Sequence, residues 1–220
     1  MLHSTREYQM SRNMNTRRSL YIICLLLLSA VGNKLDAQTV VKSVRQANDS
    51  TNHALIHQIG FDVRPGYVAP TNSFLEGDNA QRQKIDRSLS LHLKYAFQFS
   101  KDSYLGRLYP HAYQGIGVSH NTFYNSAELG NPVAVYAFQG APIVRLSSCL
   151  SLDYEWNFGA SFGWKQYDEH SNWYNDAIGS KINAYINLGF VLNWQFYPQW
   201  KLAAGVDFTH FSNGNTRYPN

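Results

Sequence analysis

Residues 151–165 read SLDYEWNFGASFGWK, with apolar and polar side chains alternating along the whole stretch. The even positions are all apolar: Leu152, Tyr154, Trp156, Phe158, Ala160, Phe162 and Trp164. The odd positions carry polar side chains or glycine. Because successive side chains of a β-strand point to opposite faces, a strand here has one apolar face and one polar or very small face. The stretch therefore predicts a single long β-strand.

The same period of two returns in six other parts of the chain. The seven predicted strands cover residues 55–67, 89–99, 113–123, 133–146, 151–165, 184–196 and 201–213. The segment 184–196 repeats the pattern clearly, whereas 113–123 is the weakest because it contains Gly115 and Gly117. No window after the N-terminal region holds 18 consecutive apolar residues, so we predict no transmembrane helix.

Strand length, aromatic positions and connection lengths favour a membrane barrel over a soluble sandwich. Several predicted strands run to 11–15 residues, whereas strands of globular proteins usually have about 5–6. Aromatic residues gather at the strand ends, as in the girdles of outer-membrane barrels: Tyr109, Tyr113, Trp164, Tyr167, Trp173, Tyr174, Tyr197 and Trp200. About nineteen residues follow the first strand and about seventeen the fifth, but only about three follow the fourth and the sixth. Long outer loops and short periplasmic turns alternate in this way, although a periplasmic β-sandwich also has alternating strands.

The fold class that we predict is all-β: an antiparallel, eight-stranded transmembrane β-barrel, of which seven strands are visible in this chain. Closed bacterial barrels have an even number of strands. An unpaired strand edge in lipid would leave backbone groups without hydrogen bonds. We therefore expect a final strand beyond Asn220.

The N-terminal region is typical of an exported protein. Residues 1–37 combine a polar extension, a basic pair, a short apolar core and a final Ala37, which together predict a secretory signal peptide. Residues 38–54 are polar and are interpreted as a periplasmic lead-in, with the barrel at 55–220. The expected location is the outer membrane of a Gram-negative bacterium.

Composition argues against nucleic-acid binding, metal sites and disulfides. The net charge is +4, and the body of the chain contains no basic cluster for a nucleic acid. Cys24 lies in the apolar core of the predicted signal peptide, which leaves Cys149 alone in the mature chain. The eight histidines show no zinc-motif spacing. We expect no metal ion and no cofactor.

One pair of side chains breaks the apolar face of the last predicted strand. The even positions are apolar up to Phe208, and His210 and Ser212 continue the same parity. A polar pair on the lipid face is costly unless it has a function or lies at the interface. Residues i and i+2 are neighbours on one face, so this pair can act as a histidine base and a serine nucleophile. Backbone amides and a carboxamide in residues 213–215 can hold an oxyanion. The strand count places the end of this last strand at the outer leaflet, where lipopolysaccharide lies.

The run HFSNGN at residues 210–215 resembles the active-site signature of the outer-membrane lipid A 3-O-deacylase family, whose relatives are often labelled acyloxyacyl hydrolase-like. The resemblance implies a barrel that hydrolyses a fatty acyl ester of lipid A. By the same resemblance, His210 is the general base and Ser212 the nucleophile. Asn213 and Asn220 are then oxyanion or site-shaping residues.

The third catalytic residue of this family is a glutamate about a dozen residues after the serine, which orients the histidine and stabilises its imidazolium. That position lies beyond Asn220, so we expect the 220-residue chain as given to be inactive. Asp207 does not substitute for it, because its odd parity places it on the opposite face from His210.

Several alternatives stay open at this point. A non-enzymatic barrel whose long loops bind something outside the cell fits the same pattern, as does a family member that has lost activity. The sequence also leaves open whether the barrel forms a homodimer. Asp153 and Glu155 form a candidate carboxylate pair, but charges inside small barrels usually pair with basic residues, here Lys94 or Arg145. The loop 166–180 contains acidic residues that calcium or substrate could contact, although a solvated outer loop is the simpler interpretation. The expected partner is lipid A in the outer leaflet.

Overall fold

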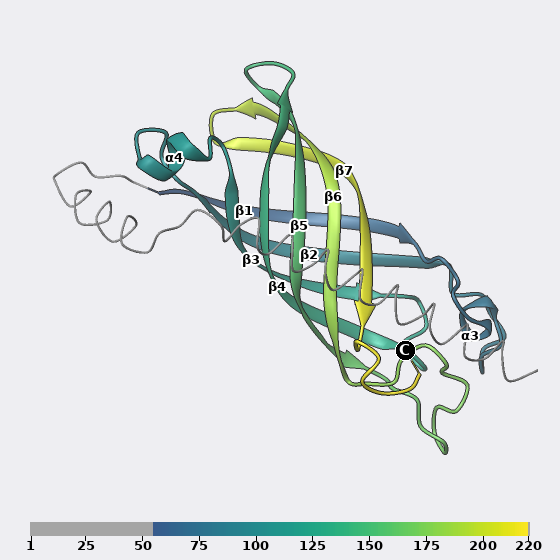
Figure 1. Cartoon of the computed structure of the whole chain (residues 1–220). Coiled ribbons are helices and arrows are strands. Elements are labelled where there is room, and N and C mark those ends of the chain that lie inside the picture. The colour runs from purple at the N-terminus through teal and green to yellow at the C-terminus, as the bar shows by residue number, and fades with distance from the viewer. Residues whose placement is uncertain (1–54, 220) are drawn as a thin grey trace, which may run out of the picture. The chain divides into compact units, whose positions relative to one another are not determined.

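The computed structural model describes residues 55–219, which form one antiparallel sheet of seven strands in chain order (Figure 1). The strands are β1 (Ile56–Tyr67), β2 (Arg87–Gln98), β3 (Tyr113–Thr122), β4 (Gly130–Arg145), β5 (Leu150–Trp164), β6 (Ile182–Tyr197) and β7 (Trp200–Ser212). Two short helices, α3 (Ser73–Glu76) and α4 (Tyr104–Leu108), lie in the connections. All seven predicted strands are confirmed. The predicted signal peptide and lead-in lie outside the described residues, as does Asn220.

The sheet is curled, and its two faces have the polarity expected of a protein in a membrane. On the outer face, Val206 and Phe208 of β7 are 74% and 71% exposed. On the inner face, Asn157 and Ser161 of β5 are 1% and 0% exposed. Exposed apolar and buried polar side chains are unfavourable in water but are the normal arrangement of a barrel in lipid. The prediction of an all-β, antiparallel barrel fold is confirmed at this level.

Within residues 55–219, neither helix is long and apolar enough to cross a bilayer.

Charged side chains meet inside the curl. Lys94 Nζ lies 2.6 and 2.7 Å from the two carboxylate oxygens of Glu155, which confirms the predicted pairing of these two residues. Arg64 lies 2.7 Å from Asp62 and 3.5 Å from Glu155. Each of these charges has a partner of opposite sign, so the whole network can be buried without leaving an unpaired charge.

Arg145, the other basic residue named as a possible partner, pairs with neither Asp153 nor Glu155 within residues 55–219. Its guanidinium donates to the His111 ring and to the Ser148 carbonyl. A register shift between Pro142 and Val144 pairs Arg145 with Ser151 at the end of the strand, away from the middle of the lumen. Asp153 instead accepts a hydrogen bond of 2.9 Å from the Asn193 carboxamide.

The two edge strands approach each other through their inward side chains. Arg64 of β1 lies 3.2 Å from Asp207 of β7, and Lys201 of β7 donates a 3.2 Å hydrogen bond to Gln58 of β1. Within residues 55–219, the backbones of β1 and β7 do not pair with each other or with another strand at their outer edges. The sheet is therefore rolled far enough for long side chains to bridge its edges. An eighth strand between them stays a prediction.

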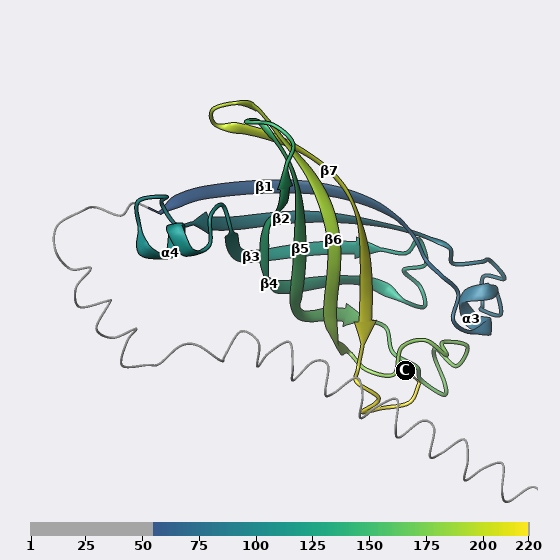
Figure 2. The same cartoon turned by 45° about the horizontal axis from the view of Figure 1, so that its top comes forward.

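The connections differ between the two ends of the sheet. One end carries residues 146–149 and 198–199, together with 99–112, which contains α4. The opposite end carries the long connections 68–86 and 165–181 together with 123–129, and we call it the outer end. Figure 2 shows α3 and the arrowhead of β7 toward the outer end and α4 at the other. The predicted alternation of long and short connections is confirmed, with 99–112 as the exception.

Candidate active site

The last strand presents alternate residues to the lumen and to the outside. Phe211 points inward, where its ring centroid lies 5.0 Å from that of Trp164, 5.5 Å from Tyr185 and 6.1 Å from Phe123. Because neighbours in a strand point to opposite faces, the residues on either side of Phe211 face outward. The aromatic cluster therefore fixes the orientation of the strand at the point where the predicted pair lies.

His210 and Ser212 lie together on the outer face at the outer end of β7. In the register of the sheet, His210 is opposite Ile186 and Ser212 is opposite Ala184. His210 is exposed, and among residues 55–219 its side chain has no hydrogen-bond or ion-pair partner. Two residues along a strand span about 6.6 Å, a separation that the two side chains can close. Phe208, 71% exposed, continues the same face toward the membrane.

The loop that follows Ser212 is organised by Asn213. The Asn213 carboxamide donates 2.6 Å to the carbonyl of Arg217 and accepts 2.9 Å from the amide of Asn215. The turn passes through Gly214 and Asn215 with φ of +66° and +61°, a conformation that suits glycine and asparagine. The amide of Gly214 donates 3.0 Å to Ser212 Oγ. The loop thus places a backbone N–H against the hydroxyl, while the Asn213 carboxamide is engaged in shaping the loop.

The same loop is anchored to the connection 165–181. Tyr218 donates 3.0 Å to the carboxylate of Asp176, and this hydrogen bond raises the pKa of the Tyr218 hydroxyl. Gly179 packs so closely that an added Cβ would lie 2.2 Å from the carbonyl oxygen of Pro219. Asn72 joins the connection 68–86 to this group by donating 2.7 Å to the Asp176 carbonyl. Sequence reasoning considered Asp176 only among the loop acids and missed Gly179 and Tyr218, because no local pattern relates residues about forty positions apart.

The outer connections form a small core of their own. Its buried members are Phe74, Leu75, Ile85 and Leu129. The partly buried residues Val68, Phe123, Tyr174, Ala177 and Ile178 pack against it. The interpretation of 166–180 as a solvated loop is therefore only partly right. Asp168 and Glu169 are exposed, but Asn175 is 0% exposed and donates to the carbonyls of Glu128 and Lys165.

The acidic groups of the outer end do not gather into an ion site. Asp168 accepts hydrogen bonds from His170 and Ser171, and these bonds, the Ser171 side chain first, lower the pKa of its carboxyl. No group of three or more His, Cys, Asp or Glu side chains in residues 55–219 is arranged to hold a metal ion.

Asp207 lies inside the sheet, away from His210. Its carboxylate accepts 2.8 Å from Asn187 and 3.2 Å from Thr209, and it pairs with Arg64. These partners all face the lumen, so the carboxylate does not reach the outward imidazole. Of the other predicted site residues, Asn220 and the third acidic member lie outside the described residues.

Comparison with known proteins gives one match. The model of the family described as lipid A 3-O-deacylase (PagL) matches residues 90–220, which include β7 and the whole of the candidate site. No curated protein and no solved structure matched the chain.

Proposed function

The chain belongs to the lipid A 3-O-deacylase (PagL) family, and we propose that it hydrolyses a fatty acyl ester of lipid A with Ser212 as the nucleophile and His210 as the general base. The single observation that carries the assignment of residues is the outward parity of this pair on an otherwise apolar strand face. Members of the family are outer-membrane proteins. The predicted signal peptide would deliver the chain to that membrane in a Gram-negative host.

The reaction follows from the chemistry of the pair. Ser212 Oγ attacks the ester carbonyl carbon of the acyl chain while His210 accepts the hydroxyl proton. The tetrahedral intermediate breaks its bond to the sugar oxygen, and His210 returns the proton to that leaving oxygen. Water then loses a proton to His210 and attacks the carbonyl carbon of the acyl-serine. The bond to Ser212 Oγ breaks, His210 returns the proton to Oγ, and the fatty acid is released.

Charge on the carbonyl oxygen needs a donor close to the attacking hydroxyl. The Gly214 amide lies 3.0 Å from Ser212 Oγ. A backbone N–H held in this position can transfer its hydrogen bond to the developing oxyanion without reorganisation. Asn213 shapes the turn that presents this amide, and we assign Asn220 to the same site.

The orientation of the pair suits a substrate that lies in the bilayer. An outward hydroxyl at the outer end would face the leaflet that contains lipid A, whereas an inward one would face the polar inner side of the sheet. The acyl chain would lie along the apolar face formed by Phe208 and Ile186, which are 71% and 42% exposed. Binding of the chain in lipid therefore needs no separate cavity.

The acid that orients His210 would come from a strand next to β7. Among residues 55–219 the free edge of β7 has no neighbouring strand, and the carboxylate of a glutamate on a strand at that edge could accept a hydrogen bond from the imidazole N–H on the outer face. This arrangement would fix the ring and stabilise the imidazolium during the reaction.

Mass spectrometry of lipid A tests the proposal. The full-length protein and its Ser212→Ala variant would be produced in a Gram-negative host, with Ser126→Ala as the matched control because Ser126 is an exposed serine in the connection 123–129. We expect the parent and Ser126→Ala to remove one acyl mass from lipid A and Ser212→Ala to remove none. Unchanged lipid A with a folded, membrane-inserted parent would reject the enzyme in favour of a non-enzymatic binding barrel.

A further inference from the structure

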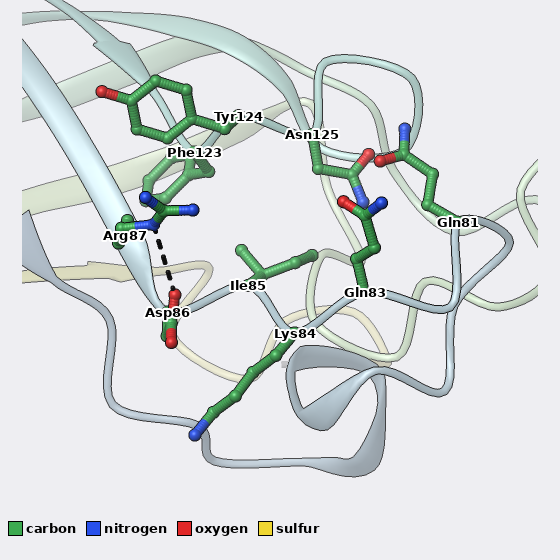
Figure 3. A pocket seen from close by; sticks show the side chains of 9 residues that line it. All are labelled: Gln81, Gln83, Lys84, Ile85, Asp86, Arg87, Phe123, Tyr124 and Asn125. Atoms are coloured by element: carbon green, nitrogen blue, oxygen red, sulfur yellow. Dashed lines mark ion pairs between the residues drawn. The ribbon is translucent and has the colours of Figure 1, made fainter.

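A small hollow lies at the outer end between the connections 68–86 and 123–129 (Figure 3). Its volume is about 60 Å³, several times the roughly 10–15 Å³ that a single water molecule needs. The hollow lies beside the outer ends of β2 and β3, whereas Ser212 ends β7, four strands further along the sheet. Its lining residue Phe123 packs against Phe211, which neighbours Ser212 on β7. The hollow is thus a distinct feature of the same end of the sheet, and it can admit part of one sugar ring.

Buried polar side chains hold both walls of the hollow in place. Asn79, 0% exposed, donates 2.7 Å to the carbonyl of Gln83 and accepts 3.2 Å from its amide. On the other wall, Glu128 accepts 2.9 Å from the Asn125 carboxamide and 2.9 Å from the amide of Ala80. The walls are thus fixed by hydrogen bonds to each other before any ligand arrives, which lowers the entropic cost of binding.

The groups that face the hollow are those that recognise hydroxyls. Figure 3 shows the carboxamides of Gln81, Gln83 and Asn125 grouped together. The carboxamides of Gln81 and Gln83 are exposed and hydrogen-bond to no other residue in 55–219. A carboxamide both donates and accepts hydrogen bonds, as does a pair of neighbouring sugar hydroxyls. Gln81 and Gln83 therefore offer complementary groups at no cost in protein hydrogen bonds, while the Asn125 carboxamide is held by Glu128.

An aromatic ring completes the hollow. Tyr124 is 64% exposed and has a left-handed backbone with φ of +58°, which its amide supports by donating 3.3 Å to the Thr122 hydroxyl. A bulky residue adopts this conformation rarely. The turn holds a flat apolar face at the rim of a polar hollow, and sugars present apolar C–H faces as well as hydroxyls. Binding sites commonly combine such a surface with a few placed polar groups.

The charges nearby are nearly balanced. Arg87 Nε lies 3.7 Å from Asp86, and the Arg87 side chain is 85% exposed. Lys84 lines the hollow, but Figure 3 shows its ammonium group extending away from the carboxamides. A free anion would therefore gain little here, because the closest cation already has a carboxylate partner.

We propose that this hollow is a second binding site, which takes the edge of a hydroxyl-rich sugar of lipopolysaccharide. The chemistry of the ligand comes from the carboxamides and from Tyr124, and its source rests on the proposed location in the outer membrane. We assign the sugar to a lipopolysaccharide molecule beside the barrel, because the hollow lies at the ends of β2 and β3 whereas Ser212 ends β7.

The test uses full-length protein in detergent and the fully deacylated oligosaccharide of lipopolysaccharide as the probe. This probe has no acyl ester, so it cannot be turned over, and titration by nuclear magnetic resonance measures its affinity. We expect Gln83→Ala and Tyr124→Ala each to weaken binding by about five-fold, the loss expected for one hydrogen bond or ring contact. Arg82→Ala is the matched control, because it removes an exposed cation of the same connection that does not line the hollow.

Three further arms separate the explanations. Ser212→Ala should bind the probe as the parent does, so loss of deacylation and loss of sugar binding are distinguishable. The dephosphorylated oligosaccharide should bind within two-fold of the probe, and inorganic phosphate alone should not bind. Binding of phosphate that Arg87→Ala abolishes would overturn the proposal in favour of an anion site. Probe affinity that is absent, or equal in the parent, Gln83→Ala and Tyr124→Ala, would overturn it outright.

Discussion

Polar side chains occur on both faces of this sheet, and the two sets are built differently. Inside, Glu155 has Lys94 at 2.6 Å and Arg64 at 3.5 Å, and the neighbouring Asn157 carboxamide donates 2.7 Å to Asn187. Outside, His210 stands among apolar residues with no side-chain partner in residues 55–219. A polar group with several partners stabilises the fold, whereas an unpartnered polar group in lipid costs stability. The comparison predicts a structural role for the inner polar groups and a functional role for His210.

The largest expected effect is the loss of chemistry on the outer face. His210→Leu should lower the rate of lipid A deacylation by about 10³-fold, because general-base catalysis is lost. The same change should raise the free energy of unfolding by up to about 1 kcal/mol, because leucine suits the lipid face near the interface better than histidine does. Rates come from timed release of fatty acid, and unfolding from urea titration in lipid vesicles. A variant that keeps its activity would remove His210 from the mechanism.

On the inner face we expect a large effect on stability and a small effect on the deacylation rate. Glu155→Gln should lower the free energy of unfolding by about 3 kcal/mol, because it leaves Lys94 and Arg64 buried with one partner fewer. The rate per folded molecule should stay near that of the parent. Glu169→Gln is the matched control, since Glu169 is an exposed glutamate in an outer connection. Equal stability of the two variants would show that the lumen network contributes no more than a surface charge.

The strands and the shared outward face of His210 and Ser212 were predictable from the sequence, because both depend on a local period of two. Alternation in 151–165 is visible without knowledge of any partner strand, and the parity of His210 and Ser212 follows from the same rule. The outer core was not predictable in this way. Phe74 and Leu129 are far apart in the chain and belong to connections without periodicity, so their contact depends on the curl of the whole sheet. For the same reason, only the structure shows the carboxamide of Asn213 engaged within its own loop.

Phe211 connects the two faces, so its replacement should affect both stability and rate. Phe211→Ala should lower the free energy of unfolding by about 2 kcal/mol, because a partly buried ring leaves the cluster of Trp164 and Tyr185. The turnover number should fall by about ten-fold, since the strand that positions the neighbouring pair loses its anchor. Phe211→Leu should restore most of the turnover. Val206→Ala, an outward change on the same strand at a residue outside the candidate site, is the control. A turnover number of Phe211→Ala equal to the parent's would show that the aromatic cluster does not position the site.

The smallest expected effect comes from the contact between the loop after Ser212 and the connection 165–181. Tyr218→Phe removes the hydrogen bond to Asp176 and should lower the deacylation rate by about two-fold at pH 8, because one exposed hydrogen bond contributes little. The hydrogen bond raises the pKa of Tyr218 above its ordinary value of about 10. The contribution of this hydrogen bond is therefore complete at a pH below the ordinary tyrosine pKa, and it is lost as the pH rises through the raised pKa of Tyr218.

The pH dependence of the ratio of parent to Tyr218→Phe rates isolates this contact, because every other titrating group is shared by the two proteins. We expect the ratio to be about two at pH 8 and to fall above the ordinary tyrosine pKa. Once the phenolate forms beside the Asp176 carboxylate, the two like charges repel, and the parent should become no faster than the variant. A ratio that stays constant across this range would mean that the anchoring of residues 213–219 does not depend on Tyr218. The position of Ser212 would then depend on contacts other than Tyr218, among them Asn213 and the aromatic anchor of Phe211.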